Sequence, residues 1–194
     1  MTTSRYPYLS ILTLNSYVEV ERAMKHVGIP LILTFRLDSG SQALLDEWRA
    51  SYFPPSRNYL KAHLTIYHQL PGQKLVSIQE ALQRVVANEK PTDLHFDGLK
   101  HHQGFVGITL SAPGVVGIKE RLDLEFKDVL RAQDRQGYRP HITVTNLGSP
   151  GDAKRCYDQL SKMFIPWTGC AVGLDLYHYH GGPWEHAATF LFEA

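Results

Sequence analysis

A short pattern that occurs twice constrains this chain more than any other feature. His63-Leu64-Thr65-Ile66 and His141-Ile142-Thr143-Val144 both contain a histidine, an apolar residue, a threonine and a second apolar residue. Both stretches are rich in β-branched and apolar residues, which predicts that each is a β-strand. Because side chains alternate between the two faces of a strand, the histidine and threonine of each copy lie on the same face, about 6.7 Å apart. An imidazole and a hydroxyl placed in this way can bind one small anion together.

The repetition carries the signal, because either copy alone is expected by chance. The chain has 10 histidines among its 194 residues, and threonine is about as frequent, so one His-x-Thr match says little. Two copies that both have apolar residues between and after the pair are improbable by chance. The alternative for either copy is a histidine and a threonine on the solvent-exposed face of an edge strand.

The segments around the motifs form two series in the same order: strand, helix, motif strand, helix, strand. This order predicts an α+β fold that is bilobal and duplicated, with two antiparallel sheets and flanking helices around a central cleft. The two motifs are expected to meet in that cleft. The strands of the two series are expected at residues 30–37, 62–70 and 93–99, and at residues 105–110, 140–146 and 171–179.

The same pattern predicts how the chain is divided. Residues 29–194 are expected to form one domain, with lobe one at about residues 29–100 and lobe two at about residues 101–194. Residues 1–28 are expected to be an N-terminal extension, because they lie outside the repeated series.

Two histidines that face each other in a cleft suit concerted acid–base catalysis. An ordinary imidazole pKa of ~6.5 lets one histidine act as a neutral base and the other as a charged acid near neutral pH. Strand alternation places Lys61 and Tyr67 on the face of His63, and Arg139 on the face of His141. A basic residue two positions before each histidine is suited to an anionic substrate.

With these motifs, the chain resembles the 2H phosphoesterases, in particular the bacterial 2′-5′ RNA ligase-like and cyclic phosphodiesterase proteins. The resemblance covers about residues 29–194 and depends on the order and spacing of short segments. These segments are Leu37-Asp38, Tyr52-Phe53-Pro54-Pro55, Ala62-His63-Leu64-Thr65, Pro140-His141-Ile142-Thr143 and Gly181-Gly182-Pro183-Trp184.

The resemblance implies hydrolysis of 2′,3′-cyclic phosphates or 2′-5′ phosphodiester bonds, with 2′-5′ RNA ligation as the reverse reaction. It implies that RNA ends or small cyclic nucleotides are the substrates. His63 and His141 are the implied acid and base, in an order that the resemblance does not fix, and Thr65 and Thr143 are the implied phosphate-binding residues. Lys61 and Arg139 are expected to add positive charge to the same site, and no metal or cofactor is expected.

Three tyrosines are candidates for stacking against a nucleobase. Tyr67, Tyr138 and Tyr179 lie in or beside the expected site strands, and proteins bind unstacked bases on such rings. Ordinary packing in the core is the alternative for each of them.

Two other functions remain open at this point. The first is a module that binds RNA ends or nucleotides without turnover. The second is a metal-dependent hydrolase, because His178 and His180 share a strand face and His186 follows a Gly-Gly-Pro turn that can return it to them.

Composition limits the partners and the compartment. A net charge of +1 gives no overall field that would attract duplex DNA. The two cysteines, Cys156 and Cys170, suit a reducing compartment better than a disulfide framework. The chain has no apolar run of about 20 residues for a membrane helix, and its first residues lack the pattern of a signal peptide. We therefore expect a cytoplasmic monomer that binds neither membranes nor duplex DNA.

Overall fold

The computed structural model of the chain describes residues 28–146 and 148–193. The expected N-terminal extension lies, apart from Gly28, outside the described residues. The strands are β1 (Leu31–Leu37), β2 (Leu64–Leu70), β3 (Thr92–His102), β4 (Phe105–Ser111), β5 (His141–Thr145), β6 (Trp167–Tyr179) and β7 (Trp184–Leu191). The helices are α2 (Ser39–Tyr52), α3 (Leu75–Val86), α4 (Pro113–Phe126) and α5 (Pro150–Met163), with short 3-10 helices η1 (Pro55–Arg57) and η2 (Gly72–Lys74).

The strands form one antiparallel sheet in the order β2-β1-β6-β3-β4-β5, with β7 paired to β6. The predicted α+β fold of antiparallel strands with flanking helices is confirmed, but the two expected sheets are joined. The joint is made by the two longest strands, β6 with 13 residues and β3 with 11. They pair with each other at one end, and at the other end β6 pairs with β1 and β3 pairs with β4.

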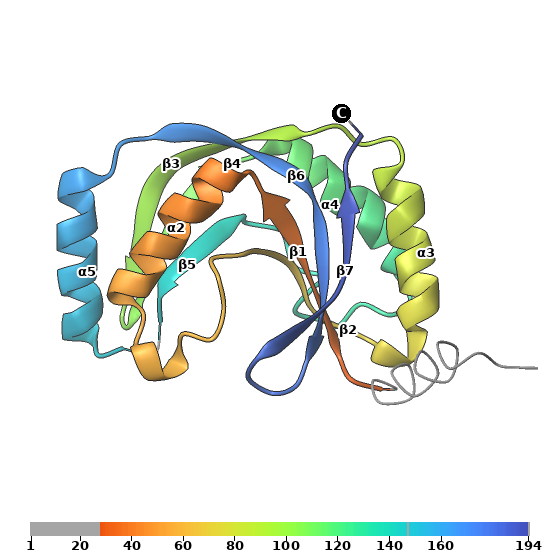
Figure 1. Ribbon diagram of the computed structural model, residues 1–194, viewed down its shortest axis with the longest axis horizontal. Coiled ribbons are helices and arrows are strands. Elements are labelled where there is room, and N and C mark those ends of the chain that lie inside the picture. Colours follow the sequence, from red (N-terminus) through yellow and green to blue (C-terminus); the bar gives the residue numbers. More distant parts are fainter. Residues whose placement is uncertain (1–27, 147, 194) are drawn as a thin grey trace, which may run out of the picture.

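The sheet curves into an arch, and this curvature positions the site (Figure 1). Successive strands in a sheet are rotated relative to one another, so a sheet with long central strands bends strongly. As a result β2 and β5, which stand at opposite ends of the strand order, come into contact. These are the two strands that carry the repeated motifs.

The two series of elements interleave in space. The strand β6 comes from the second series but lies beside β1, and α4 packs on α3. In return α2, from the first series, contacts β5. The repeat in the sequence therefore does not map onto two separate halves of the sheet.

Polar side chains fix where two of the helices begin. Asp38 precedes α2 and accepts a hydrogen bond from the Ser41 backbone N–H at 2.9 Å. Ser149 and Asp152 form a reciprocal capping box at the start of α5.

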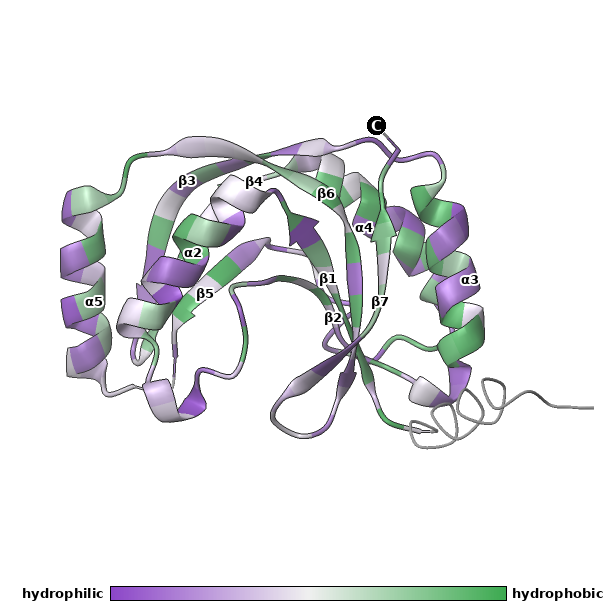
Figure 2. Ribbon diagram, viewed as in Figure 1, coloured by the Kyte–Doolittle hydropathy of each residue, from purple (hydrophilic) through white to green (hydrophobic). Residues whose placement is uncertain are grey.

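Figure 2 shows hydrophobic and hydrophilic residues alternating around α3 and α5, as expected for helices with one face on the core. Among the described residues, no helix is long and apolar enough to cross a membrane.

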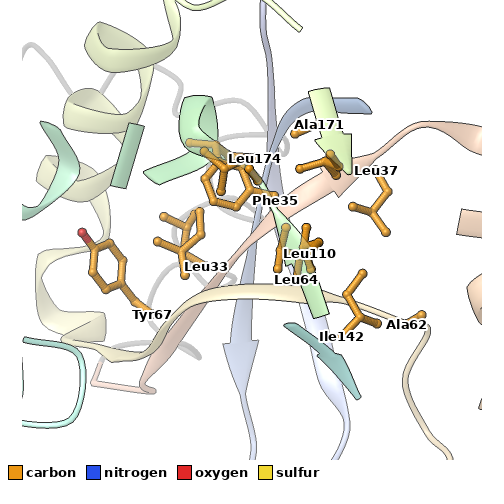
Figure 3. Packing of buried hydrophobic residues seen from close by; sticks show 14 of the residues in the cluster. Leu33, Phe35, Leu37, Ala62, Leu64, Tyr67, Leu110, Ile142, Ala171 and Leu174 are labelled. Carbon is orange, nitrogen blue, oxygen red and sulfur yellow. The ribbon is translucent and has the colours of Figure 1, made fainter. Parts of the chain in front are cut away.

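The apolar residues of both motifs anchor them in the core. Leu64, Ile66, Ile142 and Val144 are all at most 2% exposed, and Figure 3 shows Leu64 and Ile142 in the same buried cluster as Phe35. Burial of one such side chain contributes about 1.5–3 kcal/mol. Because strand side chains alternate, this burial holds the motif histidines and threonines on the opposite, accessible face.

A bulge in β2 changes the position of Tyr67. One residue of β1 pairs with Tyr67 and the next pairs with Thr65, so Ile66 is an extra residue in β2. Tyr67 is thereby turned into the core, where it is fully buried (Figure 3). Its hydroxyl donates to Asp123 Oδ1 at 2.7 Å. The prediction that Tyr67 shares a face with His63 and can stack on a base is therefore wrong.

Candidate active site

The two motifs line one cleft. His63 immediately precedes β2, and His141 is the first residue of β5. The contact between these strands brings both histidines, together with Thr65 and Thr143, around a cavity of about 720 Å³. The four residues that define the repeated pattern are therefore assembled at one place.

Both imidazole rings are held in the same way. Nδ1 of His63 lies 2.7 Å from the carbonyl oxygen of Lys61, and Nδ1 of His141 lies 3.0 Å from that of Arg139. A carbonyl oxygen can only accept, so each Nδ1 carries a hydrogen and donates it. Each neutral ring then has an unprotonated Nε2, and each charged ring has an Nε2–H. In both rings Nε2 is therefore the nitrogen that remains available for another partner.

The surroundings of the two rings differ. Burial lowers the pKa of His63 to about 4, against the opposing effect of the Lys61 carbonyl. The Trp184 ring contributes to this burial, since its centroid lies 4.6 Å from that of His63. His141 is exposed and meets the Phe105 ring edge-on at a centroid distance of 5.9 Å. At pH 7 His63 is therefore neutral and suited to act as a base.

The two predicted basic residues occupy different positions. Arg139 is exposed and lines the cleft beside His141. Lys61 is also exposed, but it lines a neighbouring cavity together with His63. Lys100, which the sequence analysis did not identify, lines the cleft as well. Phosphate binding by Lys61 and Arg139 stays a prediction.

The other two predicted stacking residues, Tyr138 and Tyr179, differ in their position relative to the cleft. Tyr138 lines the cleft, its hydroxyl donates to the Thr65 carbonyl at 3.0 Å, and burial raises its pKa. Tyr179 is half-buried and pairs with Trp184 in the β6–β7 hairpin. Tyr177, two residues earlier, lines the cavity beside His63. Stacking by Tyr138 and Tyr179 stays a prediction.

A buried arginine connects the two motifs. Arg49 is 4% exposed, and its Nε donates to the Leu60 carbonyl at 2.9 Å and to Asn58 Oδ1 at 3.0 Å. Its Nη1 donates to the carbonyl of Thr143 at 3.0 Å. Tyr138 makes the opposite connection, because it precedes the second motif and its hydroxyl donates to the carbonyl of Thr65 in the first motif.

A second buried network holds the segment that leads to the second motif. Nζ of Lys119, which is 3% exposed, donates to both carboxylate oxygens of Asp123 and to the carbonyl of Asp134 at 3.2 Å. Asp134 Oδ1 accepts the backbone N–H of His68 at 3.0 Å. Burial acts to raise the pKa of Asp134, but the hydrogen bonds from His68 outweigh it and lower that pKa. This network ties residues 134–138 to β2.

The three C-terminal histidines do not come together at one place, although the ring centroids of His178 and His180 lie 6.4 Å apart. His178 pairs with Glu185 across the hairpin, whereas His186 pairs with Tyr177 and packs on its ring at 5.5 Å. Adjacent positions face opposite sides of a strand, so His186 lies away from His178. The prediction that His186 joins His178 and His180 is therefore wrong. Within residues 28–146 and 148–193, no group of three or more His, Cys, Asp or Glu side chains is placed to hold a metal ion.

Comparison with known proteins identifies the family of the chain. The sequence model of the 2′-5′ RNA ligase superfamily matches residues 37–183, and the chain belongs to this superfamily of 2H phosphoesterases. No curated protein sequence matches the chain.

Solved structures share the fold at low sequence identity. Escherichia coli LigT in complex with 3′-AMP is 15% identical, with a TM-score of 0.61 over 86% of this chain and 99% of LigT. The protein TT0787 of Thermus thermophilus is 17% identical, with a TM-score of 0.62 over 84% of this chain and 98% of its own. A structure described as a phosphoesterase is 17% identical, with a TM-score of 0.60 over 86% and 99% of the two chains. The family and the fold support a phosphoesterase function.

Proposed function

We propose that the chain is a metal-independent enzyme that hydrolyses 2′,3′-cyclic phosphate or 2′-5′ phosphodiester bonds of RNA ends or small nucleotides. One observation carries the proposal: both histidines of the repeated pattern line a single cleft, and each has its Nδ1 fixed by a carbonyl so that Nε2 is left for chemistry. Two such groups on either side of a phosphate are what in-line displacement at phosphorus requires.

The hydrolysis of a 2′,3′-cyclic phosphate proceeds in one concerted step. Nε2 of neutral His63 takes a proton from a water molecule while the water oxygen bonds to phosphorus. The bond between phosphorus and one ribose oxygen breaks, and Nε2–H of His141 gives its proton to that oxygen. The hydroxyls of Thr65 and Thr143 donate to the other phosphoryl oxygens, where negative charge develops. In the reverse direction the two histidines exchange roles.

The burial of His63 supports this assignment of base and acid. A base must be unprotonated before the reaction begins, and burial lowers the pKa of His63 to about 4. His141, on the exposed side, is then the acid. The hydrogen bonds made by Arg49 and Tyr138 hold the two threonine carbonyls, which keeps the motifs at a fixed separation.

Nucleotides are the substrate class that the relatives favour. LigT has been solved with 3′-AMP, with ATP and with NADP+. In the present chain, the cleft combines the ring of Tyr138 with the positive charges of Arg139 and Lys100. An aromatic ring beside cationic groups suits a nucleobase attached to a phosphate.

A substrate panel tests the proposal. The protein is incubated with 2′,3′-cyclic nucleotides, 2′-5′-linked oligomers and ADP-ribose cyclic phosphate, and the products are identified by mass spectrometry. We expect turnover of at least one substrate, with and without a chelator, and loss of turnover in His141→Ala. A folded protein that binds these compounds but converts none of them would be a binding module, which contradicts the proposal.

A further inference from the structure

A third histidine lines the cleft and has no role in the proposed mechanism. His68 lies on β2, three residues after Thr65. Strict alternation along β2 would turn it to the same side as Leu64 and Ile66, into the core. Because Ile66 is the extra residue of the bulge, Tyr67 takes the buried position and the side chain of His68 is 56% exposed. The bulge therefore places a third imidazole on the accessible face of the strand.

A buried carboxylate holds the ring of His68. The side chain of Asp134 is 2% exposed, and its Oδ1 accepts the backbone N–H of His68 at 3.0 Å and lies 3.1 Å from the ring Nδ1. Burial acts to raise the pKa of Asp134, but these hydrogen bonds lower it, so the carboxylate is ionised. A carboxylate only accepts, so Nδ1 donates to it and Nε2 remains available for a partner in the cleft.

The charges around His68 suit a negatively charged partner. Among the described residues that line the cleft, Asp134 is the one carboxylate, and it is turned toward His68. Two exposed cations, Lys100 and Arg139, line the same cavity, and Gln136 adds an exposed amide on the wall that carries Asp134. An anionic group in this part of the cleft therefore meets hydrogen-bond donors and positive charge.

The distance along β2 indicates which anionic group this is. Three residues of strand separate Thr65, at the phosphate that reacts, from His68, which is a rise of ~10 Å. Side chains that reach inward from these two positions can hold the two ends of one nucleoside. A 2′,3′-cyclic phosphate occupies the 2′- and 3′-oxygens of the ribose, so the 5′-oxygen is the one left to carry a second phosphate.

We propose that His68, fixed by Asp134, binds a phosphate group on the 5′-oxygen of the nucleoside whose 2′,3′-cyclic phosphate is hydrolysed. His68 is then a residue that determines specificity, and this inference rests on the proposed function. The charged ring donates Nε2–H to a phosphate oxygen, and the carboxylate on one side and the phosphate on the other both stabilise its charged form. The 5′-phosphate is either a monoester or the diester that precedes the last nucleotide of an RNA chain.

Three substrates test this site. They are adenosine 2′,3′-cyclic phosphate, the same compound with a 5′-phosphate, and the dinucleotide ApA that ends in a 2′,3′-cyclic phosphate. We expect the 5′-phosphate to raise kcat/KM of the parent about 5- to 20-fold, mainly through KM; the exposure of the ring keeps this gain below that of a fully buried charged hydrogen bond. The assay is run at pH 6, where an ordinary imidazole is mostly charged.

Two variants of His68 separate the charge of the ring from its bond to Asp134. His68→Gln and His68→Asn both keep a side-chain amide but remove the cation, and in each the gain from the 5′-phosphate should disappear. The matched control is His95→Gln. His95 is also an exposed strand histidine, with Nδ1 3.0 Å from Thr168 Oγ1, but it lies outside the cleft lining. Its variant should keep the parental gain, and thermal unfolding checks that every variant is folded.

The outcomes separate this site from the proposed function. A gain that the dinucleotide shares identifies the RNA 3′ end as the ligand, and a gain with the monoester alone identifies a mononucleotide; either supports the site if the His68 variants abolish it. A parent that converts the unphosphorylated compound without any gain, or a gain that persists in either His68 variant, overturns the His68 site alone. A parent that converts none of the three substrates overturns the proposed function itself.

Discussion

The low pKa of His63 leads to a prediction about Trp184. Burial, to which the Trp184 ring contributes at 4.6 Å, moves the pKa of His63 from its ordinary value of 6.5 to about 4. At 1.36 kcal/mol per pKa unit this shift corresponds to about 3 kcal/mol between the two protonation states. The substitution Trp184→Ala exposes the imidazole ring of His63 to water, so we expect the pKa of His63 to rise toward 6.5.

Two measurements check this prediction. The acidic limb of the kcat/KM profile should lie near pH 4 in the parent and move up by about 1–2 pH units in Trp184→Ala, because the base must be neutral. An NMR titration of the His63 ring should move in parallel. Phe105→Ala removes the aromatic neighbour of His141 and serves as the control, with no shift in the His63 titration. Two results would refute the assignment of His63 as a buried base. One is an acidic limb near pH 6.5 in the kcat/KM profile of the parent, and the other is an acidic limb at the same pH in Trp184→Ala as in the parent.

The lowered pKa of His63 also makes the free energy of unfolding depend on pH. The unfolded chain protonates His63 near its ordinary pKa, whereas the folded chain does so only near pH 4. Between these values the unfolded state binds more protons, so the free energy of unfolding falls as the pH decreases through this window. Urea denaturation at a series of pH values should show a smaller loss for His63→Ala than for the parent.

Three further predictions concern groups around the histidines. Arg49→Met leaves buried acceptors at Leu60 and Thr143 unpaired and should lower the free energy of unfolding by about 2–6 kcal/mol, at 1–3 kcal/mol for each unpaired acceptor, as measured by urea denaturation, with Arg49→Lys showing a smaller loss. Lys61→Ala and Arg139→Ala should mainly raise KM, more strongly at low salt; unchanged steady-state kinetics in both variants would exclude their role. Activity should survive dialysis against a chelator, and a loss that zinc restores would indicate a metal site that the proposed mechanism lacks.

The sequence predicted the parts of the fold that depend on local patterns. The apolar residues of the motifs, such as Leu64 and Ile142, are buried, and the residues between them face the cleft, as the strand alternation indicates. The helix caps at Asp38 and Ser149 follow from residue type and spacing. The repeated order of elements was sufficient to predict that the motifs meet.

Features that depend on distant contacts were not predictable. The position of Tyr67 depends on a bulge at Ile66, which alternation alone cannot reveal. Arg49 lies in a helix and has no neighbour in the sequence that indicates its bond to Thr143. The pairing of β6 with both β1 and β3 joins the two expected sheets, and the hairpin register turns His186 away from His178. Each of these depends on strand pairing across the whole chain.

The roles of His63 and His141 are tested most directly by a double-mutant comparison with a 2′,3′-cyclic nucleotide as substrate. The value of kcat is measured for the parent, His63→Ala, His141→Ala and the double variant, each shown to be folded by circular dichroism. Each single variant should lose about 10²- to 10⁴-fold, the usual contribution of one proton-transfer group. The double variant should lose far less than the product of the two, because the histidines act as a unit. A folded single variant with near-parental kcat would contradict the assignment of the repeated motifs as the active site.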